Sequence, residues 1–207
     1  MPTPTKAYQE IIYSLLQTKM AELADLDRPE ELEVKKEWPA FTGIPYRYSP
    51  RVDIVVGPFS TRSGKRKTRD YDRLIKQDNI NSFLKRLYGF HKKNIGEEKG
   101  YENIEKKYIV PSFDDLLHKN QNARCFLAFE IENKNGNKHI MGSLINAASL
   151  GRIGIGIAYS PEVLRTFIRI LNYLAFLKRV DKPTYDATNF LIITKEQMQT
   201  LLENPNG

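Results

Sequence analysis

Hydrophobic positions recur at the three-to-four-residue spacing of an α-helix in several separate segments of the chain. In residues 5–26 they fall on one face, the pattern of a helix packed against a core. Ser112 and Ser160 stand where helix N-caps belong, and Thr194 with Gln197 forms a capping-box pattern. Helices are therefore predicted at residues 5–26, 79–93, 112–119, 139–150, 161–179 and from 194 onward.

Short apolar or alternating runs predict the strands of a sheet. Residues 41–59 carry two such runs punctuated by Pro and Gly, which is typical of a hairpin. Gly154 and Gly156 alternate with isoleucines and are expected to let a helix pack closely on their strand. Because strands and helices alternate in the second half of the chain, the predicted fold class is α/β, with a mixed central sheet flanked by helices. Strands are predicted at residues 52–56, 124–134, 152–159 and 190–193.

Length and composition favour one globular domain. A chain of 207 residues can bury a substantial core, and we interpret 1–207 as a single domain with a basic, helical insertion at about 60–122. The single cysteine, Cys125, can form neither an internal disulfide nor a four-cysteine zinc site, so we expect it in the core of a cytoplasmic protein. No apolar run is long enough to predict a membrane span. The net charge of +7 fits a polyanionic partner that is contacted locally.

Charged residues follow the apolar start of the predicted strand at 124–134, in the sequence FEIENK. Because side chains alternate along a strand, Glu130, Glu132 and Lys134 are expected on one face. Burying such ions unpaired is costly, so we expect them at the end of the sheet, where a divalent cation relieves the repulsion between carboxylates. Asp53, within RVDIVVG, is a further acid in an apolar run. These acids would supply the oxygen ligands that Mg²⁺ prefers, with Lys134 beside a metal-activated water, a set suited to phosphodiester hydrolysis.

Two segments carry a family resemblance. SPRVD, with Pro50 three residues before Asp53, and the E-x-K at Glu132 and Lys134 resemble the motif of the PD-(D/E)xK nuclease superfamily, which includes many type II restriction endonucleases. A second register is E-I-E, which begins at Glu130 and places Glu132 where the lysine stands. In that register Lys134 or Lys138 would supply the ammonium group. Glu10 is either an accessory acid, as some family members carry on the first helix, or a solvated residue.

The resemblance implies a Mg²⁺-dependent DNA endonuclease, in particular a sequence-specific restriction enzyme, in which Mn²⁺ can substitute. It implies metal binding by Asp53, Glu132 and Glu130 and positioning of the water by Lys134. It also implies double-stranded DNA as partner and a homodimer, because one site cuts one strand. A repair or resolvase nuclease of the same fold and a non-catalytic DNA-binding protein are the alternatives.

A basic cluster follows the strand of Asp53 and is interpreted as a phosphate contact near the metal site. His139, beside the motif, is either a phosphate contact or a plain surface residue. The cluster consists of Arg62, Lys65, Arg66, Lys67, Arg69 and Arg73.

Overall fold

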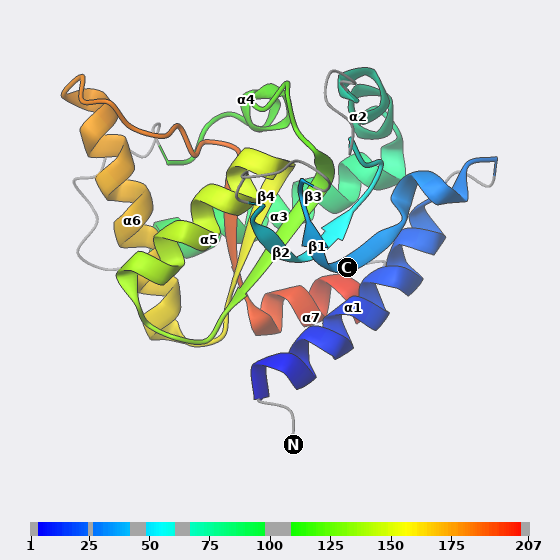
Figure 1. The fold of residues 1–207 in the computed structure, drawn as a ribbon, viewed down its shortest axis with the longest axis horizontal. Coiled ribbons are helices and arrows are strands. Elements are labelled where there is room, and N and C mark those ends of the chain that lie inside the picture. The colour runs from blue at the N-terminus through cyan, green and yellow to red at the C-terminus, as the bar shows by residue number, and fades with distance from the viewer. Residues whose placement is uncertain (1–3, 25–26, 42–48, 61–66, 98–108, 204–207) are drawn as a thin grey trace.

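A central sheet with helices on both faces forms the frame of the molecule (Figure 1). Helices α1 and α7 lie together on one face, and α5 and α6 cover the other. This architecture confirms the predicted α/β class with a mixed sheet flanked by helices. The computed structural model describes residues 4–24, 27–41, 49–60, 67–97 and 109–203.

The described strands form one sheet in the order β1-β2-β3-β4-β5. β2 is antiparallel to both β1 and β3, whereas β3, β4 and β5 run parallel. The carboxyl end of β3 therefore lies at the same edge as the amino end of β2. The strands are β1 (Val34–Pro39), β2 (Arg51–Val56), β3 (Cys125–Glu132), β4 (Gly151–Ala158) and β5 (Phe190–Thr194).

Helices lie in the connections that follow β2, and the described residues form three of them between β2 and β3, in the stretch interpreted as an insertion. Within the described part of the chain, every helix is too short or too polar to cross a lipid bilayer. The helices are α1 (Pro4–Leu23), the 3₁₀ helix η1 (Pro29–Leu32), α2 (Thr68–Ile75), α3 (Asp78–Glu97), α4 (Phe113–His118), α5 (Asn137–Leu150), α6 (Pro161–Arg179) and α7 (Lys195–Glu203).

Two hydrophobic clusters hold the layers together. On one face of the sheet, side chains such as Phe129 and Ile155 pack against α1, α2, α3, α4 and α7. On the other face, Ala128 and Ile192 pack against α5 and α6, and Cys125 is buried there as expected. The polar residues of β3 that share a face with Ala128 are therefore directed toward α5.

The caps read from the sequence are present. Ser112 and Ser160 accept hydrogen bonds from the backbone N–H groups of Asp115 and Val163. Thr194 and Gln197 form the reciprocal pair of a capping box, at 2.9 and 3.2 Å.

Three features differ from the prediction. β1 begins at Val34, upstream of the predicted hairpin, whose first run falls mostly on residues 42–48, outside the described residues. α2 forms in a segment for which no individual helix was predicted, because Tyr71, Leu74 and Ile75 are spaced i, i+3, i+4 and are buried on one helical face. β3 ends at Glu132 and not at residue 134.

The glycines of β4 set how closely α5 approaches the sheet. A Cβ at Gly154 would lie 2.7 Å from the carbonyl carbon of Ala147 and 2.8 Å from the nitrogen of Ala148, both in α5. We expect Gly154→Ala to lower the free energy of unfolding by about 1–3 kcal/mol, because backbone must move to admit the methyl group. Urea unfolding measures this change.

The matched control is Gly142→Ala, on the exposed side of α5, where no described atom lies within 4 Å of the added Cβ. It should stabilise by up to about 1 kcal/mol through helix propensity. Equal stabilities of the two alanine variants would contradict the close-packing role of Gly154.

Candidate functional site: a carboxylate cluster at the sheet edge

Three acids meet where β2 begins and β3 ends. The antiparallel register pairs Ile54 with Phe129, so the next residues, Asp53 and Glu130, stand opposite each other. Glu132 follows two residues further along β3 and points to the same face, toward α5. The side chains of Glu130 and Glu132 are almost fully buried, with 6% and 4% of their residue surface exposed. The structure therefore brings together the three acids that the sequence singles out.

Each carboxylate has a different hydrogen-bonding environment. Asp53 Oδ2 accepts the backbone N–H of Ile131 at 2.8 Å. Glu132 Oε1 accepts the hydroxyl of Ser143, a buried residue of α5. Glu130 Oε1 is buried and has no hydrogen-bond partner among the described residues. An orphaned buried acceptor is costly, and it marks the place where a cation would be most favourable.

The raised pKa values of the three acids also favour a cation at this site. Burial, and next to it the charges of Glu37 and Glu132, raise the pKa of Asp53 to about 6, against the lowering effect of the Ile131 N–H. Burial raises the pKa of Glu130 well above its usual range, and Asp53 and Glu132 raise it further. Burial also raises the pKa of Glu132. Three neighbouring acids that resist ionisation form a site that a divalent cation would neutralise.

A fourth acid, Glu37 of β1, was not recognised from the sequence. It lies across from Asp53 in the β1–β2 register, with φ 48°, a left-handed conformation that is uncommon for residues other than glycine. Gln9 of α1 links Glu37 to β2, because its amide donates to Glu37 Oε1 at 3.3 Å and to the Asp53 carbonyl at 3.1 Å. Backbone outliers concentrate at functional sites, and the residue carrying this one faces the acids.

The predicted lysine is not part of the cluster. Lys134 follows the end of β3 and is exposed, as is Lys138 in the first turn of α5, and neither forms an ion pair with a described residue. The side chain that does approach is that of His139, whose Nε2 lies 3.7 Å from Glu132 Oε2. Both acids of the E-I-E register, Glu130 and Glu132, lie on β3, whereas Lys134 of the E-x-K register lies beyond its end. Glu10, the suggested accessory acid, is exposed and forms an ion pair with Lys36 at 2.6 Å.

The basic segment lies elsewhere. α2 is anchored at the amino end of β3, because the hydroxyl of Tyr71 donates to the carbonyl of Ala123. A strand rises about 3.3 Å per residue, so Ala123 and Glu132 are separated by roughly 30 Å. The expectation that this segment adjoins the carboxylates is therefore wrong for its described part.

The individual members of the basic cluster divide into three groups. Lys67 pairs with Asp70 at 2.9 Å, and Arg73 pairs with Glu31. Arg69 is exposed on α2. The remaining members, Arg62, Lys65 and Arg66, lie outside the described residues.

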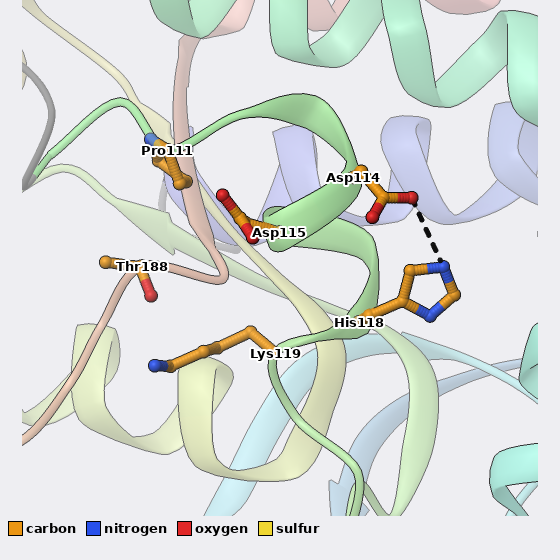
Figure 2. Close-up of a pocket in the computed structure, with 6 residues that line it drawn as sticks. All are labelled: Pro111, Asp114, Asp115, His118, Lys119 and Thr188. Carbon is orange, nitrogen blue, oxygen red and sulfur yellow. Dashed lines mark ion pairs between the residues drawn. The ribbon is translucent and has the colours of Figure 1, made fainter.

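A pocket of about 390 Å³ lies beside α4 (Figure 2). Its charges are satisfied within the protein. His118 lies 3.6 Å from Asp114, Asp115 accepts the hydroxyl of Ser112, and Lys119 pairs with Asp186 at 2.6 Å. The carboxylate cluster, with its uncompensated acids, is therefore the stronger candidate site. The pocket is lined by Pro111, Asp114, Asp115, His118, Lys119 and Thr188.

The donor set of the cluster fits a hard divalent cation, because carboxylate oxygens with retained waters are what Mg²⁺ prefers. Among the described residues, no three His, Cys, Asp or Glu side chains already surround a common point as metal ligands do. The unsatisfied Oε1 of Glu130 is the observation that supports a cation here. Comparison with protein families, curated proteins and solved structures finds no match to this chain.

Proposed function

We propose that this protein is a metal-dependent endonuclease that hydrolyses phosphodiester bonds of double-stranded DNA. The observation that carries the proposal is the cluster of Asp53, Glu130 and Glu132, in which both glutamates are buried, Asp53 is half-buried, and Glu130 Oε1 has no hydrogen-bond partner among the described residues. A site that only bound the phosphates of DNA would have no use for carboxylates, which repel them unless a cation intervenes. The PD-(D/E)xK resemblance of the same residues, now on adjacent strands, supports the assignment.

The roles of the residues follow from their places. Asp53 and Glu132, on neighbouring strands, would hold a Mg²⁺ or Mn²⁺ ion, and Glu130 would be a further ligand from the buried side. Such an ion lowers the pKa of a bound water and neutralises charge that develops on a phosphate. Ser143 and the Ile131 N–H keep the Glu132 and Asp53 carboxylates oriented. Fixed ligands of this kind reduce the reorganisation that the reaction requires.

The proposal includes a sequence-specific, dimeric enzyme of the restriction type. One carboxylate cluster cuts one strand, so a double-strand break in a single binding event needs two chains. The proposed test incubates a mixed-sequence plasmid with the protein, in Mg²⁺ and in EDTA, beside Glu132→Gln. Discrete metal-dependent fragments that the variant does not produce are the expected result. A smear of fragments would support a nuclease without sequence specificity. A plasmid that stays intact with every divalent cation tried would overturn the proposal.

The DNA surface is expected around the carboxylate edge, where Lys134 and Lys138 are exposed. Each phosphate neutralised by a cation adds about 0.9 to the slope of log affinity against log salt. Replacing both lysines by alanine should therefore reduce the slope by about 2 and weaken binding at low salt. Fluorescence anisotropy with a DNA duplex in EDTA measures both quantities.

The matched control for this experiment is Lys67→Ala with Arg69→Ala, which removes two cations from α2 at the far end of β3. It should leave the slope nearly unchanged. A larger loss in this control than in the Lys134 and Lys138 variant would place the DNA on the basic segment instead.

A further inference from the structure

The acid cluster has a nitrogen donor at its rim. His139 lies in the first turn of α5, and Ser143 lies one turn later on the same helical face. Ser143 binds one oxygen of Glu132, and the other oxygen, Oε2, faces His139 Nε2 across 3.7 Å. The imidazole is 64% exposed, so water and ions reach it freely.

The 3.7 Å separation is too long for a hydrogen bond but suits two ligands of one ion. An ion about 2.1–2.2 Å from both atoms would see them at an angle of roughly 115–125°. An octahedral ion needs about 3.0 Å between adjacent ligands, which a small rotation of the exposed imidazole provides. The distance between these two atoms therefore needs little change to admit a metal.

We propose that His139 is a metal ligand of the carboxylate cluster and that the cluster consequently prefers a first-row transition-metal ion to Mg²⁺. This inference rests on the proposed function and deepens it by naming the class of ion. Imidazole is a softer ligand than carboxylate, and it favours ions toward the middle of the first transition row, whereas Mg²⁺ favours oxygen. The orphaned Oε1 of Glu130, which is nine-tenths buried, independently marks a place for a cation in this cluster.

The first experiment measures metal binding without catalysis. Isothermal titration with Co²⁺ and with Mg²⁺ gives two dissociation constants for the wild type and for His139→Ala. The expected result is a Co²⁺ affinity at least about tenfold above that for Mg²⁺, with a loss of about tenfold for Co²⁺ and little for Mg²⁺ in the variant. The control is Asn137→Ala, a neutral and exposed side chain two residues before His139, which should change neither constant. Equal effects of His139→Ala on both ions, or none, would overturn the inference.

A second experiment locates the ligand directly, because the chain has only three histidines. Mn²⁺ should broaden the imidazole NMR signals of His139. The other two should stay sharp. His91 is buried between the Ile109 carbonyl and the Ile192 N–H. The guanidinium of Arg152, 3.0 Å from His118 Nδ1, disfavours a second cation beside His118. The broadening should vanish in Glu132→Gln. Broadening that persists in that variant would show an exposed histidine binding metal alone and would overturn the shared site.

The two proposals fail differently. If the wild type cleaves DNA with Mg²⁺ but His139→Ala binds Co²⁺ as the wild type does, the nuclease proposal stands and the histidine ligand is wrong. If the wild type binds Co²⁺ through His139 but cleaves no DNA, the metal site stands and the nuclease proposal is wrong.

Discussion

Replacing Asp53 by asparagine is expected to raise the free energy of unfolding by about 3 kcal/mol at pH 8 in EDTA. Burial and neighbouring acids raise the pKa of the carboxyl from 3.8 to about 6, so its ionised form destabilises the native state. Asparagine has the same shape, keeps an oxygen for the Ile131 N–H and carries no charge. The substitution should therefore improve stability while it removes a proposed metal ligand, as expected for a site in which function opposes stability.

The sign of the pH dependence follows from the raised pKa. Below pH 3.8 the carboxyl is protonated in both the folded and unfolded states and costs nothing. As the pH rises above 3.8 the unfolded state loses this proton first, so native stability falls between pH 3.8 and the folded value of about 6, and the loss is complete by about pH 7. The advantage of Asp53→Asn should accordingly grow from near zero at pH 4 to its full value at pH 7–8. Urea unfolding at intervals across this range measures it.

Another buried group acts in the opposite direction over part of the same range. Burial lowers the pKa of His91 from 6.5 to about 4, so its contribution to stability is lost as the pH falls from 6.5 toward 4. That loss is the same in the wild type and in Asp53→Asn, so it cancels in the difference between their free energies of unfolding. Asp72→Asn is the matched control, because Asp72 pairs with the buried Arg152 at 2.6 Å and its loss should destabilise. A difference between the wild type and Asp53→Asn that stays flat with pH would contradict the burial of this carboxylate.

Glu130→Gln is expected to reduce cleavage by at least about 100-fold while the protein remains folded. Removing an outer-shell partner of a metal already costs about 10–100-fold in affinity or activity, and Glu130 is proposed as a direct ligand. Because burial raises the pKa of this acid well above its usual range, the neutral amide should also unfold at a higher temperature in EDTA. Saturating Mn²⁺, which stabilises the wild type by binding only its native state, should have little effect on the variant.

Glu10→Gln is the control for this second prediction. Glu10 is exposed and paired with Lys36, so its loss should leave both cleavage and the metal-induced shift in melting temperature intact. An active Glu130→Gln enzyme beside an inactive Glu10→Gln enzyme would move the site from β3 to the first helix.

The acids of the site could be predicted because strand alternation is a local rule. Glu130 and Glu132 stand two residues apart in an apolar run, so their shared face follows from the sequence. Asp53 is singled out because it interrupts another apolar run, but its place opposite Glu130 comes from the pairing of β2 with β3. Glu37 could not be found in this way. Its strand has the burial pattern of an exposed edge, and its place depends on pairing across β1 and β2 together with a left-handed backbone.

The lysine and the basic segment show where local patterns stop being informative. The E-x-K match assumes that β3 continues to Lys134, but the strand ends at Glu132 and the chain turns into α5. The basic segment follows β2 in sequence, yet Asp53 lies near the amino end of β2 and the segment begins after its carboxyl end. Because β2 is antiparallel to β3, that end lies beside the amino end of β3. Only the strand direction, which no short pattern encodes, distinguishes the two ends of the sheet.

Helix α5 belongs to the core and to the carboxylate cluster at once. Its backbone at Ala147 and Ala148 lies close to Gly154, and one turn earlier Ser143 binds Glu132. A change in the distance between α5 and β4 would therefore also move Ser143 and the carboxylate that it binds, because one continuous helix makes both contacts. Heritable changes in metal preference can then arise at a glycine that no ion ever touches. A mutational library aimed at a new metal should include β4 as well as the ligands.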